Sequence, residues 1–240
     1  MAIRVIDDSK LQNIAVAIQG KDGGGQMTVD EMPTRIAAIP TRDNTTLNSL
    51  IDRSITSIEN SEVTSIGSYV FYGCGNLTSV SFPNVASIGG YAFQNCSNLA
   101  SVSLPNVTSI GGYAFHRSGL RNLYAPSTIT LASNSFFQAF YVTRLFFPNV
   151  EEIGRSSFEY CRALSTIVLH KHANLLNSNI LDNGCPAIIY VKPEDLSWFS
   201  TATNWSTLYV QNRIKSIEDL TGDDLVWYQE QLARYQAQTA

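Results

Sequence analysis

Cysteine is the residue type in this chain best suited to nucleophilic or metal-binding chemistry, and the chain contains four. Thiolates attack electrophiles and bind zinc, so a cluster of them could form a redox or metal site. Cys74, Cys96 and Cys161, however, are separated by whole multiples of a period of about 22 residues. This spacing places them at one position of a repeat, where free cysteine is a small buried side chain. Cys185 lies outside the series and would be reactive only if it were exposed.

Other residues that could bind a metal, a phosphate or a substrate lack the pattern that such a site needs. His170 and His172 flank Lys171, but two histidines alone do not form a metal site. The glycine run 23–25 has no strand before it and no Gly-Lys-Ser/Thr after it, so it does not match a phosphate-binding loop. No pair of acidic residues in a definable cleft suggests glycoside hydrolysis. We therefore expect a non-catalytic protein without a metal or cofactor.

The composition of the chain restricts its partners and its location. Charged residues make up 15% of the chain and the formal net charge is -4, so no basic field could hold nucleic acid. No segment reaches the roughly 18 apolar residues of a membrane span. The N-terminus carries Arg4, Asp7, Asp8 and Lys10 and has no uninterrupted apolar run. We therefore expect no nucleic-acid partner, no membrane insertion and no export signal.

An internal repeat of about 22 residues organises most of the chain. Each unit contributes an isoleucine or leucine to one column and a phenylalanine to another. The columns are Ile66, Ile88, Ile110, Leu131 and Ile153, and Phe71, Phe93, Phe115, Phe136 and Phe158. A proline follows the strand pattern of successive units at Pro83, Pro105, Pro126 and Pro148. Because independent columns share one period, the repeat is a structural unit.

Each unit predicts a short strand, a second extended piece and a tight return turn. Val80 and Phe82 alternate with serines, which is typical of a strand with one buried side. Residues 87–93 predict a second extended piece and a corner, where we expect glycine to supply a positive φ. Residues 95–99 should return the chain through a short helical or 3₁₀ turn. Stacked coils of this kind bury apolar columns that a single coil would leave exposed.

These units resemble the BspA-type leucine-rich repeat of bacteria. The resemblance rests on the segment Val107–Phe115, on the segment Cys96–Pro105 before it, and on their recurrence in register. It covers residues 54–210. The family resemblance implies a non-catalytic solenoid that serves as a binding or structural module.

The last part of the resemblance contains modest departures from the repeat. The segment from Ile189 to Ser206 is similar to the terminal capping unit of that family. His170 stands where a proline closes the strand of earlier units, and residues 171–185 are irregular. These departures leave the number of the last coils open.

The residues before the repeats predict a helical hairpin. Residues 9–19 place apolar side chains on one helical face, and residues 28–31 form a capping box for a second helix after the glycine-rich turn 20–26. The segment 11–33 is similar to N-terminal segments of tail and other virion proteins of phages that infect Gram-positive bacteria. This resemblance implies that the hairpin docks onto other virion proteins.

A C-terminal helix completes the expected fold. Leu225, Tyr228, Leu232 and Tyr235 lie at helical spacing within residues 216–238 and suggest an oligomer contact. We expect an α/β leucine-rich-repeat solenoid with short parallel strands and coils of about 22 residues, an N-terminal helical hairpin and a C-terminal helix. The expected domains are the hairpin over 1–45, the solenoid with its terminal cap over 46–210 and the helical tail over 211–240.

The outward strand face is the first candidate binding surface. Along this face, serines of the early coils give way to Tyr124, Phe146, Val168 and Ile189, and the neighbouring outward column contains Asn122 and Arg144. Aromatic residues and arginine are enriched at protein interfaces, so we predict a partner surface on this face. The alternative is that the irregular segment or the terminal unit covers Phe146 and Val168.

Outward turn residues are the second candidate, because turns vary more freely than the strands they connect. Among them, His116 and Arg117 are the most suitable for polar recognition. They complete the set of residues that the sequence suggests for binding.

These observations favour a virion-associated structural or adhesion protein of a bacteriophage. Its hairpin would bind other virion proteins, and its repeats would bind a host surface protein or glycan. The alternative is an adhesin of the bacterial cell surface or an interaction scaffold, and an enzyme is the third class. Because virion appendages are commonly symmetric, we expect a homo-oligomer and specifically a trimer.

Overall fold

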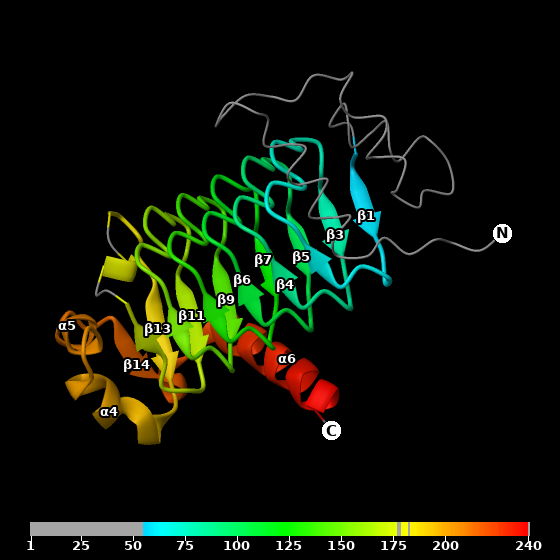
Figure 1. Cartoon of the computed structure of the whole chain (residues 1–240). Coiled ribbons are helices and arrows are strands. Elements are labelled where there is room, and N and C mark those ends of the chain that lie inside the picture. The colour runs from blue at the N-terminus through cyan, green and yellow to red at the C-terminus, as the bar shows by residue number, and fades with distance from the viewer. Residues whose placement is uncertain (1–54, 177–178, 182, 240) are drawn as a thin grey trace.

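The computed structural model describes residues 55–176, 179–181 and 183–239, and Figure 1 shows a stack of similar coils with parallel strands. In spatial order, the larger sheet consists of β1 (Ser57–Glu59), β3 (Ser79–Ser81), β5 (Ser101–Ser103), β7 (Asn122–Tyr124), β9 (Arg144–Phe147), β11 (Thr166–Leu169), β13 (Ile188–Val191) and β14 (Ile214–Ser216). The smaller sheet consists of β12 (Asn174–Leu175), β10 (Glu152–Ile153), β8 (Thr130–Leu131), β6 (Ser109–Ile110), β4 (Ser87–Ile88) and β2 (Ser65–Ile66). The expected solenoid of short parallel strands is confirmed.

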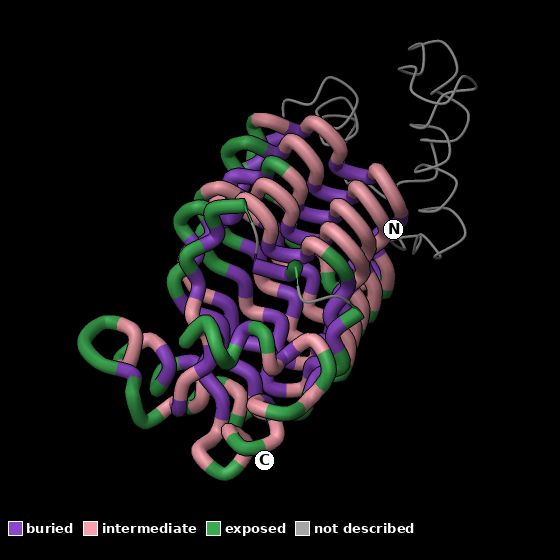
Figure 2. The backbone as a smooth tube through the Cα atoms, turned by 90° about the vertical axis from the view of Figure 1, so that its left-hand side faces the viewer, coloured by how far each residue is buried: buried purple, intermediate pink, exposed green. Residues whose placement is uncertain are grey.

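The repeated apolar columns form the core inside the coils. Neighbouring coils pair in register, so Val80 lies beside Val102 and Ile88 lies beside Ile110. The Phe93 and Phe115 rings stack with their centroids 5.3 Å apart and both are fully buried. Figure 2 shows the resulting pattern, in which buried segments recur at the same place in successive coils. Each coil buries its apolar residues against its neighbours, so their stabilities are coupled.

Glycine has a different role in the corners from the one expected. The positive φ angles belong instead to residues such as Tyr91, Tyr113 and Asn134. Gly89 is required by close approach between coils, because a Cβ atom there would lie 2.3 Å from the backbone nitrogen of Ser68. The expectation that the corner glycines supply the positive φ is therefore wrong. The corner needs glycine because neighbouring backbones almost touch.

The return segment 95–99 consists of single hydrogen-bonded turns and contains no helix. The Cys96 N–H donates to the Phe93 carbonyl, and the Leu99 N–H donates to the Cys96 carbonyl at 3.1 Å. Asn95 has a φ of 59°, which interrupts a helical path. The chain thus returns through isolated turns instead of the short helical segment that we expected.

A compact cap closes the C-terminal end of the solenoid. The irregular segment contains η2 (Asn179–Leu181), and the cap continues through η3 (Pro193–Asp195), α4 (Leu196–Thr201), α5 (Trp205–Val210) and η4 (Ile217–Asp219). The buried Trp205 donates its indole N–H to the Ala173 carbonyl at 2.6 Å. Because β14 pairs with β13, the sheet continues beyond residue 210, where we expected the cap to end.

The last helix, α6 (Gly222–Thr239), runs back along the outer face of the larger sheet (Figure 1). The C-terminal helix expected from the sequence is therefore present. The N-terminal helical hairpin expected for residues 1–45 lies outside the described residues, and the proposed division into three domains stays a prediction. Within the described part of the chain, no helix has the length and apolar character needed to cross a membrane.

Candidate binding surface

The outer face of the larger sheet carries an apolar cluster that is separate from the core. Phe146, Val168 and Tyr190 of this face pack with Leu220 and Tyr228. Phe146 is 3% exposed and Val168 is 0% exposed. The expectation of an exposed apolar stripe is therefore wrong, because the chain covers it with its own C-terminal helix. The alternative expected the irregular segment or the terminal unit as the cover, whereas the cover comes from Leu220 and α6. Ile189, expected on this face, lies in the core beside Ile167, and Tyr190 takes the outward place beside Val168. A role of Phe146 and Val168 in binding an external partner stays a prediction.

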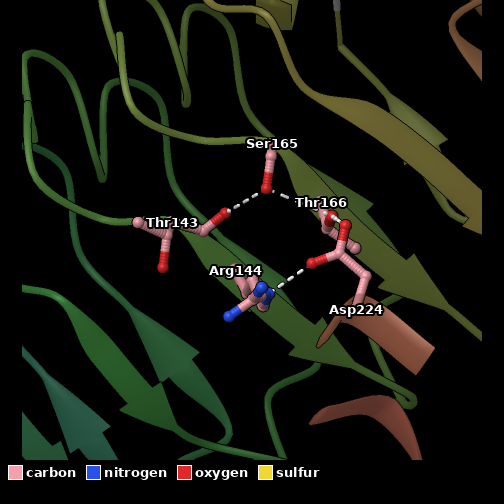
Figure 3. A network of polar contacts seen from close by, with 5 residues as sticks. All are labelled: Thr143, Arg144, Ser165, Thr166 and Asp224. Atoms are coloured by element: carbon pink, nitrogen blue, oxygen red, sulfur yellow. Dashed lines mark hydrogen bonds and ion pairs between the residues drawn. The ribbon is translucent and has the colours of Figure 1, made fainter. Parts of the chain in front are cut away.

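Polar contacts fix the first turn of α6 to the starts of β9 and β11. Figure 3 shows the Asp224 carboxylate between two strands, accepting hydrogen bonds from the Arg144 Nε and the Thr166 hydroxyl. The Thr166 bond is 2.9 Å long, and the neighbouring Ser165 hydroxyl donates to the Thr143 carbonyl at 3.1 Å. The side chains of Arg144 and Asp224 are each less than a third exposed. Their ion pair is thus shielded more than a fully solvated one.

The last turns of α6 contact Tyr124. The Arg234 guanidinium carbon lies 3.8 Å from the centroid of the Tyr124 ring, which is a close cation–π contact. The Tyr124 hydroxyl donates to the Gln238 side-chain oxygen at 3.1 Å, and the Gln238 amide donates to the Pro105 carbonyl at 3.3 Å. Burial raises the pKa of Tyr124, and the Arg234 charge opposes that rise. Tyr124 is therefore half-buried under the helix and is not a free surface residue.

A pocket of about 100 Å³ remains between α6 and the sheet. Residues of β5 and β7 and Arg144 line one side, and Trp227, Gln231 and Arg234 line the other. The spacing of the three helical residues places them on one face of α6. The pocket brings Asn122, Tyr124 and Arg144 together, which are three of the residues suggested by the sequence.

The two suggested turn residues lie elsewhere, in a column along the coil turns. Arg117 donates from Nε to the Gln138 side-chain oxygen at 2.7 Å, and the His116 Nε2 lies 3.3 Å from the same oxygen. Burial lowers the pKa of His116, the hydrogen bond to the Gln138 side-chain oxygen opposes this, and the Arg117 charge adds to the lowering. Gln138 thus holds both side chains in a local contact between coils, and their role in recognition stays a prediction.

Sequence reasoning missed a patch of two arginines and two aromatic residues in the turns that lead into β7, β9 and β11, in which both arginines and one aromatic ring are exposed and the other ring is half-buried. We call Arg121, Phe140, Tyr141 and Arg162 the turn patch. The Arg121 guanidinium lies 5.9 Å from the Tyr141 ring centroid, and the Arg162 guanidinium lies 5.9 Å from the Phe140 ring centroid. Tyr141 is 54% exposed. Phe140 and Tyr141 lie in a return turn where other coils carry small or polar residues. This departure from the repeat could have revealed the patch from the sequence.

The cysteines lack the environment of reactive thiols. All four are buried, and the Cys96 and Cys161 thiols donate to the carbonyls of Phe71 and Phe136 at 2.9 and 3.0 Å. Burial raises the pKa of Cys96 and Cys161 well above the usual range and raises the pKa of Cys185 to about 11. Because the thiolate is the nucleophile, these groups are poorly suited to covalent chemistry.

The histidine cluster also has a structural environment. His170 lies against α6, with its Nε2 3.2 Å from the Tyr228 hydroxyl. The His172 ring stacks on Trp198 at 4.2 Å and pairs with Asp195 at 2.9 Å. Among the residues that the structure describes, no group of three His, Cys, Asp or Glu side chains could hold a metal ion.

Comparison with solved structures supports the fold. The leucine-rich repeat protein TpLRR of T. pallidum is 26% identical, and the match covers 57% of this chain and 69% of that chain with a TM-score of 0.51. A leucine-rich cell surface protein from Faecalibacterium prausnitzii A2-165 is 26% identical, with 48% and 39% covered and a TM-score of 0.34. A leucine-rich repeat protein from Bacteroides ovatus is 17% identical, with 57% and 47% covered and a TM-score of 0.35. The chain thus spans less than half the length of the last two proteins.

Comparison with protein families identifies the repeat. No curated protein matches the chain significantly. The family described as "BspA type Leucine rich repeat region (6 copies)" matches residues 64–189 and 132–221, which together span more than half of the chain. These matches include every coil from β2 to β14. With its paired columns and stacked parallel strands, the chain belongs to the family of BspA-type leucine-rich repeat proteins.

Proposed function

We propose that this protein is a non-catalytic interaction module of the bacterial cell surface, which uses its solenoid to bind another protein. The repeat supports this proposal, because stacked coils present an extended surface on which side chains of successive units line up. The chemistry of the interior agrees with it, since the cysteine thiols are buried and their pKa values are raised.

The observation that carries the proposal is the turn patch. Tyrosine and arginine are the residues most enriched among the energetic centres of protein interfaces. In this patch each arginine lies near an aromatic ring, so less side-chain freedom has to be lost when a partner binds. The strand face nearby is covered by α6, whereas Tyr141 of the turn patch is 54% exposed.

Site-specific photo-crosslinking in cells of the source organism tests this function. A photo-reactive amino acid at Tyr141, which is 54% exposed, should form a discrete cross-linked product with another protein. The same amino acid at Val210, which is 84% exposed on the cap, is the matched control and should give no such product. Identical products from both positions, or none from Tyr141, would contradict an interface at the turn patch.

A role in a phage virion is the second candidate. It is supported by the similarity of residues 11–33 to N-terminal segments of virion proteins, and these residues lie outside the described part of the chain. Mass spectrometry of density-purified phage particles should find peptides of the chain at stoichiometric abundance if it is a virion protein. Detection at the cell surface and absence from particles would leave the cell-surface role.

Light scattering of the purified chain tests the expected homotrimer.

A further inference from the structure

The pocket under α6 is a cationic site with unused hydrogen-bond donors. Two of its lining residues are arginines and none is acidic. Asp224 engages the Nε of Arg144, and within the described residues no hydrogen bond reaches the terminal nitrogens of Arg144. Arg234 lies on the Tyr124 ring, and its one hydrogen bond among the described residues goes to the Gln231 side-chain oxygen at 3.4 Å. The negative charge of Asp224 thus balances the positive charge of Arg144, and the positive charge of Arg234 has no acidic partner in the lining.

The size of the pocket limits what could enter it. A volume of about 100 Å³ corresponds to the space of roughly three water molecules in the liquid. Pockets for whole small-molecule ligands have volumes of roughly 300 to 1,000 Å³, so only a terminal group fits here. The lining also includes the Ser101 and Ser103 hydroxyls and the Asn122 amide, which have no side-chain hydrogen bond within the described residues. A small anion with several acceptor positions matches these donors.

A carboxylate is the group with the best match. The two oxygens of a carboxylate lie in one plane and can accept two parallel hydrogen bonds from a guanidinium group. Its single negative charge would balance the positive charge of Arg234. Asn122 of the lining directly follows Arg121 of the turn patch along the chain. A partner on the turn patch could therefore place a side chain into the pocket without displacing α6.

We propose that this pocket binds the side-chain carboxylate of a glutamate or aspartate that belongs to a protein partner. The proposal rests on the proposed function for the source of the carboxylate, whereas the preference of the pocket for a carboxylate can be measured without any partner. A free carboxylate should bind weakly, with a dissociation constant on the order of 1 mM, because Arg234 is largely exposed. Binding should weaken as salt is added.

Titration of the purified full-length chain with N-acetylglutamate, followed by NMR, tests the pocket. The indole N–H resonance of Trp227, assigned by its loss in Trp227→Phe, reports on the pocket lining. We expect a saturable shift with N-acetylglutamate and none with the neutral N-acetylglutamine. Arg234→Gln should weaken binding about tenfold, since it removes a charge-assisted donor. Arg155→Gln removes the same charge from an exposed position outside both the pocket and the turn patch, and it should leave binding unchanged.

Asn122→Asp provides a second variant in case the loss of Arg234 disturbs the docking of α6. It adds a negative charge to the lining from the sheet side, and the exposed Asn122 side chain has no hydrogen bond to α6 that could be lost. We expect it to abolish the shift. An absent or non-saturable shift, an equal response to N-acetylglutamine, or an equal loss in Arg155→Gln would overturn the proposal. If N-acetylglutamate binds but photo-crosslinking at Tyr141 fails, the carboxylate site stands and the partner role of the turn patch does not.

Discussion

At the scale of single residues, burial changes the chemistry of groups that would be reactive on a surface. Cys96 and Cys161 occupy one position of successive coils, and each thiol donates to a carbonyl of a neighbouring coil. Desolvation disfavours the thiolate, so the same residue type that serves as a nucleophile elsewhere fills space here. The period in the sequence was sufficient to predict this, because a catalytic cluster has no reason to follow the spacing of a structural repeat.

Thiol labelling tests the burial of the cysteines. We expect iodoacetamide at neutral pH to leave all four described cysteines of the folded chain almost unlabelled, because all are buried and the pKa values of Cys96, Cys161 and Cys185 are raised. In denaturant all four should react. Mass spectrometry of both samples measures the difference. Rapid labelling of Cys185 in the folded chain would show that this thiol is accessible, contrary to its burial.

His170 makes stability depend on pH. Burial lowers its pKa to about 4, the Lys192 charge lowers it further, and Asp195 opposes them. In the unfolded chain the pKa of histidine is about 6.5, so the unfolded state binds a proton first as the pH falls. Stability should therefore decrease below about pH 6.5 and level off below about pH 4, by about 1–2 kcal/mol after allowance for solvent screening.

Urea unfolding at pH 7 and pH 5 measures this effect. His170→Gln removes the titrating group, so the difference in free energy of unfolding between the two pH values should be smaller than in the unaltered chain. Because the pKa of His116 is also lowered by burial, part of the pH dependence should remain in this variant. An unchanged difference would place the pH dependence entirely on other residues.

At the scale of elements, the distance between coils decides which residues are tolerated. The coil that contains Gly119 has a step of 21 residues between Ile110 and Leu131, one fewer than the coil before it. In this shortened coil a Cβ atom on Gly119 would lie 2.1 Å from the Ser97 carbonyl oxygen. The Gly119 N–H also donates to the Cys96 carbonyl at 2.9 Å. The missing side chain is therefore what allows the shorter coil to keep its register.

Gly119→Ala should destabilise the chain, because backbone atoms of the neighbouring coil would have to move. We expect a loss of about 1–3 kcal/mol, which is typical of an added methyl group in a well-packed interior. Gly75→Ala is the control, since its nearest contact would be the flexible Ser97 side chain at 3.4 Å, and it should change stability by less than about 0.5 kcal/mol. Thermal unfolding of both variants measures the two losses of stability. Equal losses would argue against the close approach of neighbouring coils as the cause of the destabilisation.

The sequence predicts the coils well and the placement of the C-terminal helix poorly, for a physical reason. Columns of Ile and Phe recur with one period, and a buried column must face the interior of every coil. The helical spacing of Leu225, Tyr228 and Leu232 predicts an amphipathic helix, but one apolar face does not specify which surface it covers. The sequence did indicate that the two could pack together, because the strand face with Phe146 and Val168 and the apolar face of α6 each needed an apolar surface to cover it.

The same limit applies to the candidate site. Asn122, Tyr124 and Arg144 were suggested from the sequence because they point outward on neighbouring strands. The other wall of the pocket comes from residues far along the chain, and the nearby contact between Arg144 and Asp224 joins residues 80 positions apart. Such a pairing has no period and no motif, so the sequence does not specify which helix residues line the pocket.

At the scale of the whole molecule, the solenoid closes its C-terminal end and one face by different means. The cap buries Trp205 and Phe199 against the last coils, and α6 lies across the outer face of the larger sheet. A face that carries Phe146, Val168 and Tyr190 would otherwise promote association between copies. The fold therefore separates two kinds of aromatic surface, one covered by the chain itself and one, the turn patch, left accessible.

Tyr228→Ala tests whether α6 is a necessary cover for this face. Tyr228 is 8% exposed, and its ring contacts Phe146 and His170 with centroids 6.2 and 6.0 Å apart. Removal of the ring should cost about 2–4 kcal/mol and speed up hydrogen exchange in α6 while the coils stay protected. Val226, 56% exposed on the same helix, is the control, and Val226→Ala should change neither quantity by a measurable amount. If exchange in α6 and in the coils accelerated together, the helix would unfold with the solenoid as one unit, and α6 would be part of the fold instead of a separable cover.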